Sequence, residues 1–302
     1  MLRHDGLLGP VTLVARGRDL RTDQDGRPVE VDAARIQALV TFRDRVIEQL
    51  ELDPPVPATA ALVGVSMRSG FRRRIEELLP GRRGDVVHQL LDDLPTGMLV
   101  GGVAVHVAGV LPQKADAARF PVDLCAGYAA DGTLQELLTT TGMPRNLPRQ
   151  AAPPLPATDD PDSWHRLDPL PPHSVRRVRR IDVWHESGSP AGIEAFFRDS
   201  HTDEDGTESV VHEYVVRAAL DVGTGAFTAC EADYGALPWP ECPAALASAG
   251  RLVGTTAADL RERVRTEFSG PTTCTHLNDT LRSLEPVPAL LDLLAADHPR
   301  TS

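Results

Sequence analysis

Alternation of apolar and polar residues marks two stretches in the second half of the chain, EYVVRAALDV at 213–222 and GAFTACEADY at 225–234. A period of two is typical of β-strands, and the Gly-Thr-Gly that joins them indicates a hairpin turn. The pattern becomes helical over AADLRERVRTEF at 257–268, which Ser-Gly-Pro ends, and a second helix is expected to begin near Thr275. A hairpin followed by helices predicts an antiparallel sheet covered by helices, which is an α+β unit.

The first half of the chain gives a weaker signal. TLVARGRD at 12–19 has the pattern of an extended segment, but DAARIQALVTFRDRVIEQL at 32–50 fits a helix on periodicity alone. Further along, MLVGGVAVHVAGVL at 98–111 is an apolar run that we interpret as a buried strand or a pair of strands. Periodicity by itself therefore does not decide the structure of this half.

An internal repeat reduces this ambiguity. RDLRTDQDG at 18–26 returns as RDSHTDEDG at 198–206, and an offset of 180 residues gives ten identities in the 36 positions from 18 to 53. The offset then becomes 190, because the second copy holds ten extra residues. At this offset LVG at 62–64 aligns with LVG at 252–254. We interpret this repeat as a tandem duplication. It predicts two tandem pseudo-symmetric α+β units, each an antiparallel sheet covered by helices, with strands in both copies.

The repeat and the distribution of prolines divide the chain. Nine prolines lie in residues 144–172, which predicts an extended connector on the surface with Trp164 as its apolar anchor. A degenerate first repeat is predicted at 1–99, and a structured connector follows at 100–143. The Pro-rich linker at 144–172 leads to a second repeat at 173–302, which holds the candidate site.

Composition excludes several classes of function. The 302 residues are 41% hydrophobic and carry a formal net charge of −12, which argues against a nucleic-acid partner, because such binding neutralises phosphates with Lys and Arg. No apolar run reaches the about 20 residues that cross a bilayer. The N-terminus lacks the apolar core of a secretory signal, and four scattered cysteines do not make a disulfide scaffold. We therefore expect a cytoplasmic protein with reduced thiols and no membrane partner.

Motifs for nucleotide cofactors and for nucleophile elbows do not occur in the sequence. It has no GxGxxG after a strand, no GxxxxGK followed by Ser or Thr, and no GxSxG. We therefore expect a small-molecule substrate and acid–base or metal-assisted chemistry of the lyase, hydratase, isomerase or hydrolase type. The alternative, from a different class, is a non-catalytic metal or iron–sulfur carrier or an accessory protein.

Acidic residues shared by the two copies are interpreted mainly as turn chemistry, because Asp-Gly supplies the positive φ of a tight turn. They are Asp19 and Asp199, Asp23 and Asp203, and Asp25 and Asp205. A calcium loop that begins at His201 is excluded, because it would need carboxylates in place of His201 and His212.

Softer polar groups distinguish the second copy from the first. They are His212, Glu213, Cys274 and His276, which align in the repeat with Asp32, Ala33, Gly84 and Val86 of the first copy. Cys242 lies in or beside the ten-residue insertion. A site present in one copy alone is not required by the fold, so these residues are the candidates for function.

Metal binding is one interpretation of these candidates. Cys274 precedes a predicted helix, where backbone N–H groups and the helix dipole favour a thiolate. His276 follows two residues later, and Cys242 also precedes a helical stretch. Two thiolates and an imidazole suit zinc or iron, so the candidate metal ligands are Cys242, Cys274 and His276, although no CxxC pair is present.

Catalysis without a metal is the second interpretation. His212 and His276 would exchange protons, because an imidazole pKa of about 6.5 allows transfer in both directions near neutrality. Glu213 would orient them or serve as a base, and Cys274 would act as a ligand or nucleophile. In a third interpretation the same thiols and imidazoles are structural, and the sequence leaves all three open.

The second copy resembles the family catalogued as domain of unknown function 2889. The resemblance rests on VRRVRRIDV at 175–183, HEY at 212–214, ECP at 241–243, LVG at 252–254 and CTHL at 274–277. It implies no established reaction, and the first copy departs from the pattern at the polar positions. A β-meander with a cysteine at one helix start and another beside a histidine is also similar to iron–sulfur scaffold proteins. That likeness implies that Cys242, Cys274 and His276 lie near one another.

Overall fold

The structure is a computed structural model that describes residues 1–3, 6–23, 25–108, 121–140, 142, 150–156, 160 and 162–295. The chain forms two compact units, each assembled from separate stretches of sequence. The first unit consists of Met1–Val110, Pro153–Arg176 and His201–Glu208, and the second of Leu111–Ala152, Arg177–Ser200 and Ser209–Ser302.

An antiparallel meander forms the sheet of the first unit. Its strands follow the order β1-β2-β3-β4 and have the bounds Leu2–Arg3, Val11–Thr22, Pro28–Val40 and Ile47–Asp53. β2 and β3 pair from Val11↔Val40 to Thr22↔Pro28. Residues 32–50 thus form the end of β3, a turn and the start of β4, as the repeat predicts, and not the helix that periodicity allowed. Every second residue from Ala34 to Val40 is buried, so the period of two applies where β3 meets the core.

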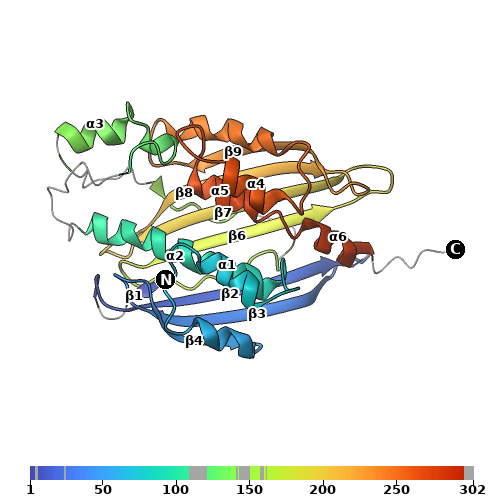
Figure 1. The fold of residues 1–302 in the computed structure, drawn as a ribbon, viewed down its shortest axis with the longest axis horizontal. Coiled ribbons are helices and arrows are strands. Elements are labelled where there is room, and N and C mark those ends of the chain that lie inside the picture. The colour runs from blue at the N-terminus through green and yellow to red at the C-terminus, as the bar shows by residue number, and fades with distance from the viewer. Residues whose placement is uncertain are drawn as a thin grey trace. The chain divides into compact units, whose positions relative to one another are not determined.

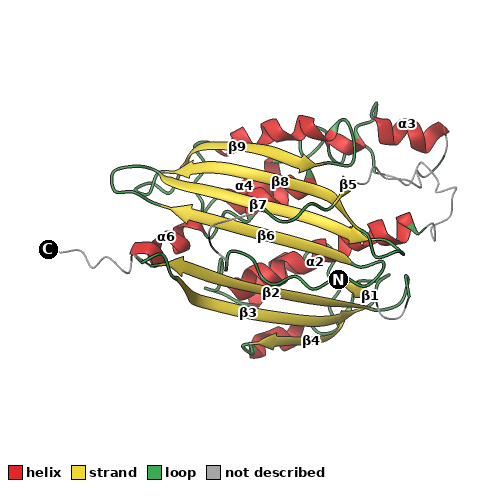
Figure 2. Cartoon of the chain, turned by 180° about the vertical axis from the view of Figure 1, so that it is seen from behind, coloured by secondary structure: helices red, strands yellow, loops and turns green. Residues whose placement is uncertain are grey.

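Helices cover one face of this sheet (Figures 1 and 2). They are the 3-10 helix η1 at Pro57–Leu62, α1 at Phe71–Leu78 and α2 at Val86–Val107. The apolar run that we expected to form strands at 98–111 is helical as far as Val107, so that expectation is wrong over this part, while 109–111 lie outside the described residues. A continuous apolar run does not distinguish a buried strand from a buried helix, and Met98 and Ala104 are buried on α2.

The sheet of the second unit has five strands. They are β5 at Gln150–Ala151, β6 at Val175–Trp184, β7 at Ala191–Thr202, β8 at Glu208–Leu220 and β9 at Phe227–Ala236. β8 pairs with β7 on one side, and its other side is shared between β5 and β9. The predicted hairpin at 213–234 is therefore present, and the fold class is α+β with antiparallel sheets and helices.

Helices also cover one face of this second sheet, seen from the helix side in Figure 1 and from the strand side in Figure 2. The helical segments are η3 at Ala126–Tyr128, α3 at Thr133–Thr140, η4 at Cys242–Leu252, α4 at Leu260–Glu267, α5 at Thr275–Arg282 and α6 at Val287–Ala295. Phe197 and Tyr214 of the strands share one buried core with Leu260, Leu277 and Leu281 of α4 and α5. This core fixes α5 against the sheet.

Asp23 and Asp203 each stabilise a tight turn, as their Asp-Gly sequences predict. The Asp23 carboxylate accepts hydrogen bonds from the backbone N–H groups of Asp25 and Arg27. Asp203 does the same for Asp205 and Thr207. The glycines that follow, Gly26 and Gly206, have φ of +78° and +83°, a region that costs glycine little.

The Pro-rich linker is extended where the structure describes it. Its described residues between 150 and 172 form no helix, and Gln150 and Ala151 form the short strand β5 by pairing with Val210 and Ser209. Trp164 is half-buried, and its indole N–H donates to the Pro156 carbonyl at 3.1 Å. Residues 143–149, 157–159 and 161 lie outside the described part.

Candidate functional site

The site lies on the helix-covered face of the second sheet. Side chains on a strand alternate between faces, so His212 lies on the same face as the buried Tyr214, two residues later. Asp199 shares a face with the buried Phe197 of β7 in the same way. Arg177 of β6 lies beside them, because its guanidinium donates two hydrogen bonds to the Asp199 carboxylate at 2.9 and 2.7 Å.

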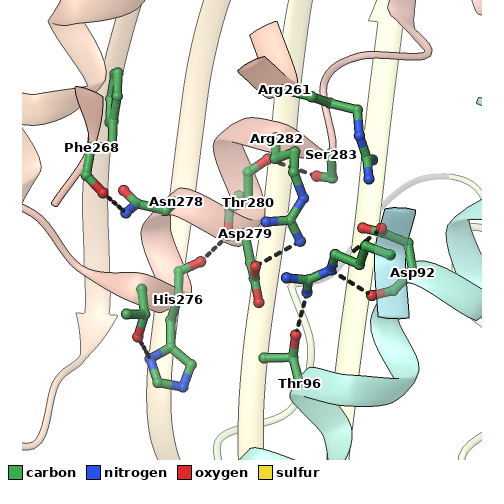
Figure 3. A network of polar contacts seen from close by, with 12 residues as sticks. Asp92, Thr96, Arg261, Phe268, His276, Asn278, Asp279, Thr280, Arg282 and Ser283 are labelled. Carbon is green, nitrogen blue, oxygen red and sulfur yellow. Dashed lines mark hydrogen bonds and ion pairs between the residues drawn. The ribbon is translucent and has the colours of Figure 1, made fainter. Parts of the chain in front are cut away.

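The start of α5 brings the remaining groups to this face. Cys274 is the extended N-cap residue, and its carbonyl accepts the first helical hydrogen bond from Asn278 at 2.8 Å. The Asn278 side chain donates to the Phe268 carbonyl at 2.8 Å and joins the helix to the end of α4 (Figure 3). Leu277 is fully buried on the neighbouring face of α5. The helix start therefore has a fixed position, with His276 in its first turn.

Three donor groups converge there. Their ligand atoms, one each from His212, Cys274 and His276, all lie within 4.8 Å of one another. His276 Nδ1 is 3.9 Å from Cys274 Sγ and 3.4 Å from the Thr275 hydroxyl. Among the residues that the structure describes, this is the one group of three such donors at this spacing.

A carboxylate lies behind His276. Asp199 Oδ2 is 3.7 Å from His276 Nε2, and the Asp199 side chain is 1% exposed. The carboxylate favours a proton on Nε2, which leaves the lone pair of the ring on Nδ1, beside Cys274. The neighbouring Arg177 supplies the positive charge that a buried carboxylate requires.

Both imidazoles are neutral at neutral pH. Burial lowers the pKa of His276 to about 4, and Arg177 adds to this shift. Burial also lowers the pKa of His212 well below its ordinary value, and His276 adds to it. The two rings are stacked, with centroids 3.7 Å apart and planes 16° from parallel. Nδ1 of His212 is buried and has no hydrogen-bond partner among the described residues.

Cys274 departs from the expectation of a stabilised thiolate. Its side chain is buried, and burial raises the pKa of the thiol above its ordinary value. The Tyr214 hydroxyl is buried without a hydrogen-bond partner among the described residues. It lies near the thiol and is the main group that opposes this rise in the pKa of Cys274. Desolvation therefore outweighs the helix start, and the thiol stays protonated unless another cation replaces its proton.

Glu213 is not part of this group. It follows His212 by one residue, so its side chain points to the opposite face of the sheet, where Arg198 of β7 donates a hydrogen bond to it. The Glu213 carboxylate lies against Gly235 of β9, where an added Cβ would collide with it. The structure therefore does not bring Glu213 together with the two histidines.

Cys242 is also outside the group of three donors. It begins η4 and packs with Leu134, Leu138 and Trp239 in a separate apolar cluster. Burial raises the pKa of its thiol to about 12, and Cys274 adds to the shift, so the two thiols are near enough to interact electrostatically. Of the three metal ligands expected from the sequence, Cys274 and His276 lie together, and the third donor beside them is His212 and not Cys242.

Two acidic residues and two arginines make up the charged surroundings. Besides Asp199, Arg177 pairs with Asp279 at 3.3 Å. Asp279 pairs in turn with Arg282 at 2.7 Å (Figure 3). Sequence reasoning missed this network. Asp199 was assigned to turn chemistry because both copies have it, and the signal that could have found it is the Arg-rich stretch at 175–180, whose Arg177 needs a buried partner.

Comparison with known protein families gives a match in the second half of the chain. Residues 175–289 match the model of a family described as protein of unknown function (DUF2889). This segment contains every residue of the site described above. A search of curated proteins found no match, and neither did a search of solved structures. No helix in the described parts of the chain is long and apolar enough to cross a membrane.

Proposed function

We propose that the second unit is an enzyme that acts on a small organic molecule without a nucleotide cofactor. The reaction is of the lyase, hydratase, isomerase or hydrolase type. The observation that carries this proposal is the convergence of His212, Cys274 and His276 within 4.8 Å, with Asp199 behind His276. Asp199 thus takes the orienting role that the sequence suggested for Glu213.

The arrangement supports activation of a water or of a polar substrate group. The contact with Asp199 holds the His276 ring with its lone pair towards Cys274. The His276 side chain is 15% exposed, whereas Asp199 is 1% exposed, so His276 is the part of this pair that a ligand can reach. A lone pair oriented by a buried carboxylate is the common feature of histidine bases and histidine metal ligands.

A non-catalytic carrier of metal or of an iron–sulfur cluster is the second candidate. The observation in its favour is the gathering of thiols, because Cys125 and Cys242 both interact electrostatically with Cys274. A carrier releases its cargo and leaves small molecules unchanged, whereas an enzyme changes them. The two candidates therefore differ in whether any small molecule is converted.

A comparison of matched variants tests the proposed function. The wild-type protein is incubated with a panel of esters, lactones, amides, hydroxy acids and unsaturated acids, and conversion is followed by mass spectrometry. We expect His276→Ala and Cys274→Ala to lower any conversion by about 100-fold or more. Cys230→Ala removes a buried thiol of β9 outside the site and should retain activity. Conversion that persists in both site variants would contradict the proposal. Failure of the wild-type protein to convert any compound of the panel would contradict it as well.

The first unit is, we propose, a degenerate copy that lacks the site. The bounds of β7 and β8 are those of β2 and β3 displaced by 180 residues, and β9 begins at the position that matches the start of β4. At the matched positions the first unit has Asp32, Gly84 and Val86 in place of the three donors. These residues supply neither a thiol nor an imidazole.

A further inference from the structure

We infer that Cys274, His276 and His212 are the three protein ligands of one zinc-class divalent metal ion, with Asp199 as the carboxylate that orients His276. This inference names the cofactor of the site proposed above and rests on that function only for its catalytic consequence. The metal site itself can be tested without any substrate.

The first argument is the spacing of the donor atoms. A tetrahedral zinc ion bonds sulfur at about 2.3 Å and imidazole nitrogen at about 2.1 Å, which puts those two atoms about 3.6 Å apart. Cys274 Sγ and His276 Nδ1 are 3.9 Å apart in the structure. The third donor, on His212, lies within 4.8 Å of both. A rotation of the His212 ring, together with small movements of the other two side chains, is needed to bring all three to bonding distance.

The second argument is the orientation of His276. A metal-binding histidine usually donates its other ring N–H to a carboxylate, which fixes the ring and makes the ligand more basic. His276 has this arrangement at a longer distance, because Nε2 lies 3.7 Å from Asp199 Oδ2, beyond hydrogen-bond distance, while Nδ1 faces Cys274. Arg177 in turn holds Asp199 through two hydrogen bonds. A ligand, its orienting carboxylate and the support of that carboxylate are thus all in place.

The third argument is the unpaired nitrogen of His212. Its Nδ1 is buried without a hydrogen-bond partner among the described residues, and a buried polar atom in that state destabilises the fold. Stacking keeps the planes of the two rings nearly parallel with centroids 3.7 Å apart, so lone pairs that lie in these planes do not both point at one ion in this arrangement. Because His276 is oriented by Asp199, the His212 ring must turn about its χ2 bond when the metal binds, a rotation that is soft for histidine. The bond to the metal then satisfies Nδ1.

The donor set and the local charge select the metal. One thiolate and two imidazoles are borderline-soft ligands, which suit zinc and do not suit magnesium or calcium. The charged neighbours Arg177, Arg282, Asp199 and Asp279 sum to zero, so they do not repel a cation. The metal replaces the proton of the Cys274 thiol, and one H⁺ is released to solvent for each ion bound. Three protein ligands leave the fourth position for water or substrate, as in catalytic zinc sites.

The test is a metal titration of the whole chain, purified without a histidine tag and stripped with a chelator. Zinc is added in a calorimeter, and cobalt(II) is added separately as a spectroscopic probe. We expect one equivalent of either ion, with a thiolate-to-cobalt charge-transfer band in the near ultraviolet. Cys274→Ser should abolish this band and lower the affinity by at least about 100-fold, and Asp199→Asn should lower it by about 10- to 100-fold.

Matched cysteines serve as controls. Cys242→Ser and Cys230→Ser remove buried thiols outside the three donors and should leave stoichiometry and band unchanged. Loss of the band in Cys242→Ser, or no binding by the wild-type chain, would overturn the inference. If Cys274→Ser or Asp199→Asn does not fold, His276→Gln is the replacement, and the wild-type cobalt spectrum still decides whether a thiolate is bound.

The outcomes separate the cofactor from the reaction. If the chain binds a metal through these ligands but converts no small molecule, the metal site is supported and the proposed enzymatic function is contradicted. Conversion that depends on His276 in a chain that binds no metal keeps the enzyme and contradicts the metal site.

Discussion

Arg177 is the residue on which the buried charges of the site depend. It bonds to both Asp199 and Asp279, and none of the three side chains is more than 11% exposed. Loss of one partner from a buried ion pair leaves an uncompensated charge, which costs more than the pair itself contributes. Arg177 is thus the common ion-pair partner of two buried carboxylates.

We predict that Arg177→Met lowers the free energy of unfolding by about 3–5 kcal/mol, because two buried carboxylates lose a partner. Urea denaturation followed by circular dichroism measures the change. Arg217→Met is the matched control, because the Arg217 and Glu194 side chains are 52% and 39% exposed. That change should cost no more than about 1 kcal/mol. Similar losses in the two variants would show that burial of the Arg177 pair has no energetic consequence.

Asp19 of the first unit should make stability depend on pH. Burial, together with Asp32 and Asp85, raises the pKa of its carboxyl from 3.8 to about 6. The folded chain therefore binds this proton more tightly than the unfolded chain. Its stabilising effect is complete below about pH 4 and is lost as the pH rises to about 6 and above. Asp19→Asn should accordingly stabilise the protein at pH 8 relative to wild type and have little effect at pH 4.

The measurement for Asp19 is the urea midpoint of wild type and variant at pH 4, 6 and 8. Asp25→Asn serves as control, because the Asp25 carboxylate lies in an exposed turn. A difference between Asp19→Asn and wild type that is the same at all three pH values would contradict the prediction.

At the scale of elements, Gly127 allows η3 to pack against the start of η4. A Cβ at this position would lie 2.8 Å from Cys242 Sγ and 2.9 Å from Trp239 Cδ1. We predict that Gly127→Ala destabilises the protein by about 1–3 kcal/mol, because the core cannot accept the added methyl group without moving. Gly97→Ala is the control, since a Cβ there meets nothing within 4 Å inside α2. It should be neutral or stabilising by up to about 1 kcal/mol, and equal losses would contradict the packing argument.

Element patterns also explain which parts could be predicted from the sequence. The hairpin strands β8 and β9 follow from their alternation, and β3 and β4 of the first unit follow from the repeat. The run at 98–111 could not be assigned, because strand and helix bury such a run equally well. Strand alternation already separates Glu213 from His212, so that error could have been avoided. The meeting of His276 with Asp199 depends on how α5 packs on the sheet, which no local pattern encodes.

At the scale of the whole molecule, the proposed duplication predicts one site per chain. An experimental structure should superpose residues 11–53 on 191–233, with Asp32 in the place of His212. Metal titration should give one equivalent and not two, because the first unit offers no thiol or imidazole at the matched positions. Two equivalents, or strands that fail to superpose at the offset of 180, would contradict a degenerate first copy.

The buried charges around Asp199 have a consequence for the response to salt. Mobile ions screen exposed charges strongly but reach buried pairs poorly. Arg177, Arg282, Asp199 and Asp279 are each at most 13% exposed, and their charges cancel. The ionic strength of the medium should therefore have almost no effect on how this centre holds a ligand, even though the chain as a whole carries a net charge of −12.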